Sequence, residues 1–253
     1  MIQKAQINDI SVESLIQRIG SDCIQYSLQG IHCIQQERPV FYQECLARLV
    51  SSDGSIYSAG QFLPAIAKNN GMADFDLCMI EKAGIELKSN LEAIVGLNIS
   101  VETISSKENW SIFKERLTIL EVNPKRLILE LTETEELSDL DVISTNLTEA
   151  REMGYLIAAD DFGAGYFNLN QLERLKFDII KIDAGIVQRA ENIKDESLLC
   201  MVGLAKCFAE VIVVEGIETV NQLYFAEQAG ATHVQGYHIS VPIFRGVNKG
   251  QSL

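Results

Sequence analysis

The stretch Leu156-Ile-Ala-Ala-Asp-Asp-Phe-Gly163 contains a short apolar run that ends in two adjacent aspartates and a glycine. A short apolar run bounded by polar and turn residues is typical of a strand buried on both faces of a parallel sheet. Residues 140–153, just before it, have apolar residues three and four apart, as an amphipathic helix does. We therefore interpret the rest of the chain in units of a helix followed by a buried strand that ends in polar residues.

The same unit recurs along the chain and predicts an α/β fold. Alternating strands and amphipathic helices are expected when each strand of a parallel sheet is followed by a helix that covers it. Eight such strands favour a TIM-type (β/α)8 barrel over an open doubly wound sheet, although strand number alone does not decide closure. The expected strands are residues 24–34, 40–50, 94–99, 127–131, 156–160, 177–182, 211–215 and 232–235, and the expected helices are residues 74–90, 110–121, 140–153, 196–210 and 220–229.

The first two expected strands are joined by residues 35–39 alone. Parallel strands need a crossover of about a dozen residues, whereas antiparallel strands can be joined by a short turn. We therefore expect a hairpin here, and a barrel whose first strand runs antiparallel to its neighbours.

The length and composition of the chain suit a single barrel. It has 253 residues, of which 47% are hydrophobic, and α/β barrels of this size form one domain. It has four prolines and no Gly/Ser-rich linker, so the one candidate boundary lies near residue 20. We expect residues 1–20 to form an N-terminal cap or linker segment and residues 21–253 to form the barrel.

The formal net charge of −14 limits the partners of this protein. A surface that follows a nucleic-acid backbone needs clustered Lys and Arg, so a nucleic-acid partner is not expected, and a substrate that carries phosphate would need metal ions. The N-terminal sequence MIQKAQINDISVE has no apolar signal region, and no stretch of about 18 apolar residues occurs. We expect a cytoplasmic protein with no membrane segment within this chain.

Acidic or amide residues, and one lysine, stand at or just past the C-terminal ends of most expected strands. Barrel enzymes assemble their active sites at this edge. A single carboxylate there is most often an ordinary solvated loop residue, but the same arrangement on six strands indicates a shared site. The residues concerned are Asn98, Glu130, Asp160, Asp161, Lys181, Glu215 and Gln235.

The adjacent pair Asp160 and Asp161 suits a site for two metal ions. Mg²⁺ and Mn²⁺ prefer oxygen ligands, and two such ions about 4 Å apart can clamp an in-line phosphoryl displacement. One aspartate could bridge both ions while the other binds one; the alternative for Asp161 is a helix N-cap. Lys181 lies in an apolar run, where a lysine is costly to bury unless it meets an anion. It would either orient the attacking water or neutralise the carboxylates.

These residues, in this order, resemble the EAL-domain family of bacterial cyclic di-GMP phosphodiesterases over residues 29–242. The signature tripeptide of the family corresponds to Glu44-Cys45-Leu46, and its other blocks correspond to QFLP, LNIS, ELTE, DDFGAGY, KID, EGIE and QGY. The resemblance implies a TIM barrel with an antiparallel opening strand, a homodimer and an enzyme that uses Mg²⁺ or Mn²⁺, with two ions per site. The implied reaction hydrolyses one phosphodiester of cyclic di-GMP to linear pGpG and so lowers this second messenger in bacterial signalling. The alternative is a non-catalytic cyclic di-GMP receptor or protein-interaction module on the same barrel.

The resemblance also implies roles for individual residues. The metal ligands would be Glu44, Asn98, Glu130, Asp160 and Asp161; the catalytic residues would be Lys181, Glu215 and Glu218; the substrate contacts would be Gln29, Leu46, Arg48, Asp183 and Gln235; and Glu133 would brace the loop after DDFG. Whether Glu215 serves as a base or as a ligand of the second ion stays open.

The chain departs from the family pattern at several positions. Cys45 replaces the signature alanine, but it should point away from the face that Glu44 and Arg48 share, because strand residues alternate between faces. The usual GTGYSSL reads GAGYFNL at residues 163–169, which removes hydroxyls from a loop that in the family couples dimer contacts to metal binding. Gly30 and Leu49 replace a usual proline and tryptophan, which would alter the grip on the substrate.

Overall fold

The computed structural model of this chain describes residues 23–35, 37–132, 139–165, 167–189 and 196–246. Its strands are β1 (Ile24–Cys33), β2 (Val40–Val50), β3 (Ile56–Ser58), β4 (Val95–Ile99), β5 (Leu127–Thr132), β6 (Leu156–Phe162), β7 (Ile179–Ile182), β8 (Val211–Val214), β9 (His233–Val234) and β10 (Ile243–Phe244). Its helices are α2 (Ala59–Ala67), α3 (Met72–Ser89), α4 (Val101–Ile104), α5 (Lys107–Ile119), η1 (Pro124–Arg126), α6 (Leu140–Glu152), α7 (Leu169–Leu175), α8 (Ala184–Arg189), α9 (Glu196–Ala205) and α10 (Val220–Ala229).

Within these residues, eight strands form a closed ring in the order β1, β2, β4, β5, β6, β7, β8 and β9. The ring closes because β1 pairs with both β2 and β9. Each neighbouring pair from β2 to β9 is parallel, whereas β1 is antiparallel to both of its partners. The predicted TIM-type barrel with an antiparallel first strand is confirmed, and the open doubly wound sheet is wrong.

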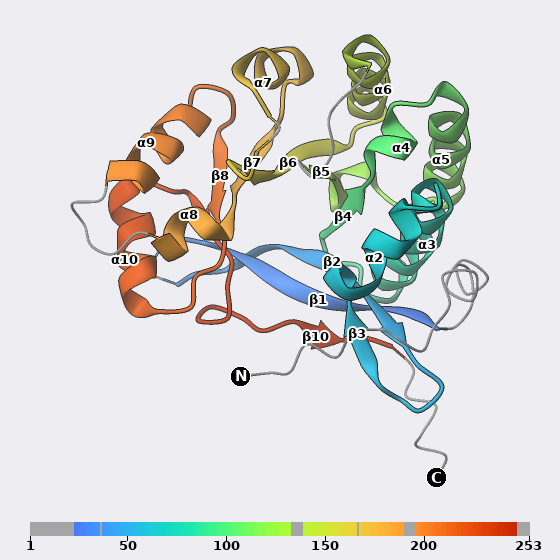
Figure 1. Cartoon of the computed structure of the whole chain (residues 1–253), viewed down its shortest axis with the longest axis horizontal. Coiled ribbons are helices and arrows are strands. Elements are labelled where there is room, and N and C mark those ends of the chain that lie inside the picture. Colours follow the sequence, from blue (N-terminus) through green and yellow to red (C-terminus); the bar gives the residue numbers. More distant parts are fainter. Residues whose placement is uncertain (1–22, 36, 133–138, 166, 190–195, 247–253) are drawn as a thin grey trace.

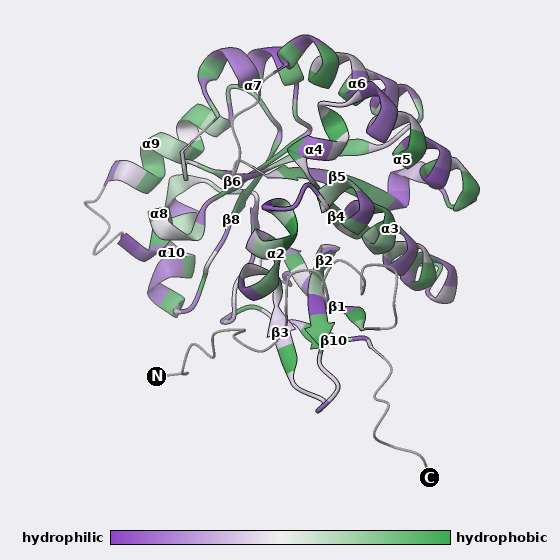
Figure 2. Cartoon of the chain, turned by 45° about the vertical axis from the view of Figure 1, so that its right-hand side comes forward, coloured by the Kyte–Doolittle hydropathy of each residue, from purple (hydrophilic) through white to green (hydrophobic). Residues whose placement is uncertain are grey.

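The first hairpin pairs from Ile24 opposite Leu49 to His32 opposite Val40, as the short connection predicted. Helices α3 to α10 lie in an arc around the strands, and β1, β2 and β10 lie on the side that this arc leaves open (Figure 1). The helices carry both hydrophilic and hydrophobic residues (Figure 2), as amphipathic helices that cover a sheet do. Among the described residues, none of the helices has the combination of length and hydropathy that crossing a membrane requires.

The five expected helices are all present, and both ends of α10 have a local cause. At the start of α10, the Thr219 side chain accepts a hydrogen bond from the backbone of Gln222, whose own side chain accepts one from the backbone of Thr219. At its end, Gly230 has φ 81°, a conformation that glycine adopts without strain. The helix expected at residues 196–210 is shorter than predicted, because α9 ends at Ala205. The cap predicted for residues 1–20 lies outside the described residues.

Side chains that point into the barrel form two layers, because residues two apart on a strand share a face. The lower layer, which we call the plug layer, packs separately from the larger core between strands and helices; it contains Ile31, Tyr42, Ile128, Ala158, Ile179 and Val213. Five of these residues lie two positions before a candidate site residue, so the plug layer is the floor of the mouth. The residues above them are, in the same order from Tyr42, Glu44, Glu130, Asp160, Lys181 and Glu215.

Candidate active site

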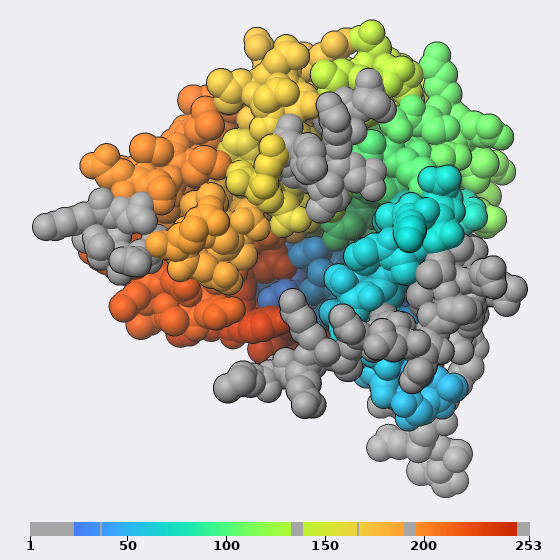
Figure 3. All heavy atoms as spheres, viewed as in Figure 1, coloured from blue at the N-terminus to red at the C-terminus, as the bar shows by residue number. Residues whose placement is uncertain are grey.

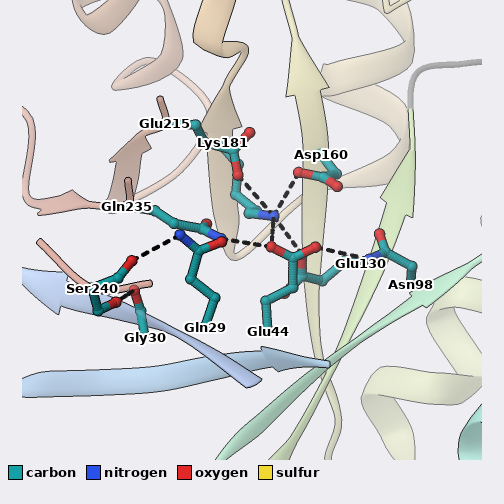
Figure 4. Close-up of polar contacts among 10 residues, drawn as sticks. All are labelled: Gln29, Gly30, Glu44, Asn98, Glu130, Asp160, Lys181, Glu215, Gln235 and Ser240. Carbon is teal, nitrogen blue, oxygen red and sulfur yellow. Dashed lines mark hydrogen bonds and ion pairs between the residues drawn. The ribbon is translucent and has the colours of Figure 1, made fainter. Parts of the chain in front are cut away.

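Lys181 lies at the centre of the mouth of the barrel, and its side chain is fully buried. Its Nζ atom is 2.7 Å from Glu130, 2.7 Å from Asp160, 2.9 Å from Glu215 and 3.3 Å from Glu44 (Figure 4). These side chains come from β2, β5, β6, β7 and the residue after β8. The parallel register therefore gathers residues far apart in sequence around one ammonium group.

The acidic groups outnumber the cations around them, and burial makes their charges costly. Burial raises the pKa of Glu130 against the opposing effect of Lys181, and with the contribution of the neighbouring Glu44 and Asp160 the pKa reaches about 8. Burial and Asp160 raise the pKa of Asp161 to about 7. Burial also raises the pKa of Glu215 well above its ordinary value. The cluster thus carries an excess of negative charge that additional cations would relieve.

Glu44 is the exception, because two amide side chains hold its carboxylate. Burial alone would raise its pKa, but Lys181 and hydrogen bonds from Gln235 and Asn98 lower it below the ordinary value. Asn98 Nδ2 donates to Oε1 at 2.9 Å, and Gln235 Nε2 donates to Oε2 at 2.7 Å. A carboxylate can only accept, so the two amide nitrogens must face Glu44 and the two amide oxygens must point elsewhere. Both oxygens, Asn98 Oδ1 and Gln235 Oε1, are buried without a hydrogen-bond partner among the described residues.

Two groups of three carboxylates can each contribute oxygens to one metal ion. Glu44, Glu130 and Asp160 form the first group, and Asp160, Asp161 and Glu215 form the second; in each, the ligand atoms lie within 4.8 Å of one another. Asp160 belongs to both groups, as expected of a residue that bridges two ions. The donor set is all oxygen and its charge is negative. Within the described part of the chain, the buried Oε1 of Glu130 and Oδ1 of Asn98 have no partner, so the residues fit hard divalent ions such as Mg²⁺ or Mn²⁺.

The two adjacent aspartates reach the same site because the strand is irregular there. Successive residues of a regular strand point to opposite faces. The pairing of β6 with β7 shifts between Ala159 and Phe162, and Asp161 has φ 56°, in the left-handed region that non-glycine residues rarely adopt. The strand continues to Phe162, so the mouth gains the second carboxylate from a bulge and not from the end of the strand. The N-cap alternative for Asp161 is wrong, because the next helix, α7, is capped by Asn168.

The mouth opens into two hollows that meet at Asp160 and Asp161. The polar hollow has a volume of about 370 Å³, and Gln29, Glu44, Lys181, Glu215, Glu218 and Gln235 are among the residues that line it. The apolar hollow has a volume of about 440 Å³ and lies towards α2 and α3, where Leu46, Leu63, Pro64, Phe75 and Met79 are among its lining residues. The space-filling view shows this face hollowed at its centre, with residues of the first hairpin deep between the surrounding segments (Figure 3).

Four of the expected substrate contacts lie in or beside the mouth, but their surroundings differ. Gln29 is buried, and both polar atoms of its side chain have a partner: Nε2 donates to Ser240 O at 3.0 Å, and Oε1 accepts from Gln235 at 3.3 Å. Leu46 lines the apolar hollow, whereas Gln235 lines the polar one. Arg48 is half-buried, and its hydrogen bond to Ala47 O leaves the rest of its guanidinium for an anion.

One expected residue, Asp183, lies outside the two hollows, and a second expected residue is not described by the structure. Asp183 accepts a hydrogen bond from Gly185 N at 3.0 Å at the start of α8, and it lines neither hollow. Its role as a substrate contact therefore has no support from the geometry. Glu133, the residue expected to brace the loop after DDFG, lies outside the described residues.

Three of the positions that depart from the family pattern, Cys45, Phe167 and Asn168, have local structural explanations. Cys45 is 2% exposed and packs in the core between the strands and the helices, on the opposite side of β2 from Glu44. In the altered loop, the Asn168 side chain accepts from Gln171 N at 3.1 Å and caps α7, while the ring of Phe167 packs edge-on against Phe177. These two replacements thus stabilise the start of α7.

Sequence reasoning missed two residues directly beneath the site, Tyr42 and Gly96. They lie two positions before Glu44 and Asn98 on the same strand faces, so the period of two could have identified them. A Cβ atom on Gly96 would lie 2.0 Å from Glu130 Oε1 and 2.6 Å from Tyr42 Cε2. Gly96 therefore leaves the space that the carboxylate and the ring occupy.

Sequence comparison relates the chain to proteins of known family. The profile described as "EAL domain" matches residues 12–242. "Probable cyclic di-GMP phosphodiesterase PdeA" of Escherichia coli (strain K12) is 34% identical over 217 residues, which are 79% of this chain and 28% of that protein. "Probable cyclic di-GMP phosphodiesterase PdeB" of the same organism is 31% identical over 77% of this chain and 38% of its own length. The chain thus spans less than half of these relatives.

Structure comparison gives the same relationship. "PaMucR Phosphodiesterase, c-di-GMP complex" is 25% identical, with a TM-score of 0.80 over 92% of this chain and 96% of that one. "Crystal structure of FimX EAL domain from Pseudomonas aeruginosa bound to c-di-GMP" is 20% identical, with a TM-score of 0.81 over 92% and 96% of the two chains, a likeness that concerns the fold alone. The barrel, the acidic mouth and the matched profile together show that this chain belongs to the EAL domain family.

Proposed function

We propose that this chain is a metal-dependent phosphodiesterase that hydrolyses one phosphodiester bond of cyclic di-GMP and releases linear pGpG. The observation that carries the proposal is the pair of carboxylate groups that share Asp160 beside the buried Lys181. Two relatives that are more than 30% identical bear the name cyclic di-GMP phosphodiesterase, which supports this substrate.

The shape of the mouth supports an elongated dinucleotide. Two hollows flank the shared aspartates, so a molecule with phosphates at its middle could extend a base into each. The apolar hollow suits the flat face of a purine, since its walls are mostly aliphatic and aromatic. The net charge of −14 would repel such an anion in the absence of bound cations.

The residues divide the work as follows. Glu44, Asn98, Glu130 and Asp160 would hold one divalent ion, and Asp160, Asp161 and Glu215 would hold another. Bound there, these ions supply the positive charge that promotes ionisation of a water and stabilises the phosphate during an in-line displacement. The attacking oxygen forms a new bond to phosphorus as one ester P–O bond breaks, and the freed sugar oxygen takes up a proton.

Lys181 and Arg48 complete the proposed chemistry. Lys181 contacts carboxylates of both groups and would keep them, and the attacking water, in place. Arg48 would donate to a phosphate oxygen: it lines neither hollow, but it follows Leu46 by two positions on β2, and its hydrogen bond to Ala47 O leaves it spare donors. Glu215 is a member of the second carboxylate group, which favours a ligand over a base for this residue.

The test is a product assay on the purified chain. Cyclic di-GMP incubated with Mg²⁺ or Mn²⁺ should give linear pGpG, separated by chromatography, and EDTA should abolish the product. Glu44→Ala should lose turnover, whereas Glu115→Ala, which removes an exposed carboxylate on α5, should retain it. Binding of cyclic di-GMP without any pGpG would favour the receptor alternative. The homodimer and the cytoplasmic location stay predictions.

A further inference from the structure

Tyr42 is an unusual member of the plug layer. Its neighbours Ile31, Ile128, Ala158, Ile179 and Val213 are all aliphatic, so Tyr42 brings the one polar side-chain atom to this group. The residue is 1% exposed, and its hydroxyl has no hydrogen-bond partner among the described residues. A buried hydroxyl without a partner is destabilising, and such groups in native proteins generally have a specific cause.

An acceptor without a partner lies next to this ring. Lys181 donates to Glu130 Oε2 at 2.7 Å, but Oε1 of the same carboxylate is buried and has no partner among the described residues. Oε1 and the edge of the Tyr42 ring lie against the same point above Gly96, since a Cβ there would be 2.0 Å from the first and 2.6 Å from the second. A protonated tyrosine hydroxyl is a donor and a carboxylate oxygen is an acceptor, so the two groups without partners are complementary.

The carboxylate directly above Tyr42 already has partners. Both oxygens of Glu44, one layer above Tyr42 on the same strand, accept amide hydrogens from Asn98 and Gln235. Asp160 Oδ1 faces Lys181 Nζ at 2.7 Å, whereas Glu130 Oε1 has no partner among the described residues and lies beside the Tyr42 ring above Gly96.

We propose that Tyr42 is a positioning residue, whose hydroxyl donates to Glu130 from beneath, directly or through one water, and so orients this carboxylate for a divalent ion. The inference rests on the proposed function, because Glu130 is there a ligand of the first ion. Gly96 is required for this arrangement, since a side chain at that position would separate the Tyr42 ring from the Glu130 carboxylate. Hydrogen bonds to ligating carboxylates orient them and tune the affinity of the site.

The test measures binding of Mn²⁺ alone to the purified full chain, by electron paramagnetic resonance titration, together with thermal unfolding in metal-free buffer. Tyr42→Phe removes the hydroxyl and keeps the ring, and it should weaken Mn²⁺ binding about tenfold. Its melting temperature without metal should show that the variant stays folded, since phenylalanine keeps the ring that fills the plug layer. Tyr155→Phe is the matched control: this tyrosine is 3% exposed, its hydroxyl donates to Leu117 O at 3.4 Å, and it packs in the outer core away from the mouth.

The outcomes separate this inference from the proposed function. Weaker Mn²⁺ binding in Tyr42→Phe, with normal binding in Tyr155→Phe, would support the positioning role. Gly96→Ala should show the same loss, because the added methyl displaces the carboxylate. Equal Mn²⁺ affinity in wild type and Tyr42→Phe would overturn the inference and leave the proposed function standing. Absence of Mn²⁺ binding in the wild type would instead refute the metal site, and with it the role of Tyr42.

Discussion

The ammonium nitrogen of Lys181 lies 2.7 Å from Oε2 of Glu130, and neither side chain exposes any surface. Burying two charges costs free energy that their mutual attraction offsets only in good geometry. Here one lysine contacts four carboxylates, so its charge cannot balance theirs. The mouth therefore holds more negative than positive charge, and most of the predictions below follow from this excess.

Lys181→Met should destabilise the metal-free protein and stop turnover. Removing one partner of a buried ion pair costs about 3–5 kcal/mol of unfolding free energy. Added Mn²⁺ should restore much of this stability, because the ions bind the folded state alone. Turnover should stay at least about a hundredfold below wild type at saturating Mn²⁺ if Lys181 also acts on the water. Recovery of full activity with Mn²⁺ would show that the lysine only neutralises the carboxylates.

The two adjacent aspartates should differ in the number of ions that they control. Asp160 belongs to both carboxylate groups and Asp161 to one. Asp160→Asn should therefore abolish binding of both Mn²⁺ ions, whereas Asp161→Asn should leave one, as counted by calorimetric titration. Asparagine tolerates the left-handed conformation of residue 161, so this substitution changes charge with little change in backbone strain. Equal stoichiometry in the two variants would contradict the shared-ligand geometry.

Metal-free stability and metal affinity should respond to pH in opposite directions. The pKa of Glu130 is raised from 4.5 to about 8, and that of Asp161 from 3.8 to about 7, in both cases chiefly by burial. The folded protein therefore holds protons that the unfolded chain releases at lower pH, so its unfolding free energy falls as the pH rises through this range. Mn²⁺ competes with the same protons, so its affinity should rise between pH 6 and about 8. Denaturant unfolding and Mn²⁺ titration at several pH values check both trends.

Cys45→Ala should leave the metal site intact. The thiol packs on the side of β2 opposite to Glu44, in the core that faces the helices. Its replacement should cost about 1 kcal/mol of stability through a small cavity and leave Mn²⁺ affinity unchanged. Glu44→Ala, one residue earlier, should remove a ligand of the first ion and lower Mn²⁺ affinity sharply. A loss of Mn²⁺ binding in folded Cys45→Ala would show that the face assignment of this strand is wrong.

The strands of the barrel could be predicted from sequence, because strands buried on both faces are short, continuous apolar runs. The antiparallel opening was readable as well, since residues 35–39 are too few for a crossover. Short elements were missed: α7 and α8 have seven and six residues, too few to show a helical period. The box formed by Asn168 and Gln171 was a local signal for the start of α7 that the pattern of apolar residues does not contain.

The candidate site was predictable as a set of residues but not as a geometry. The ends of the expected strands placed Glu130 and Lys181 in one site, whereas Glu44 was assigned to it through the resemblance to the EAL-domain family. The bulge that turns Asp161 into the mouth depends on the register between β6 and β7, which no local pattern encodes. The period of two places Tyr42 beneath Glu44 and Gly96 beneath Asn98, but the contact between these two residues depends on the register of β2 against β4, which lie far apart in sequence.

The bond between Gln235 and Glu44 joins residues 191 positions apart, and it forms only when β9 closes against β1. Closing such a long loop is entropically costly and slow, because no local contact compensates it beforehand. During synthesis, β1 therefore cannot pair with β9, and the barrel cannot close, until nearly the whole chain has been made. Until then β1 and β8 present open strand edges, which makes the half-built barrel an aggregation hazard and ties the assembly of the mouth to the last step of folding.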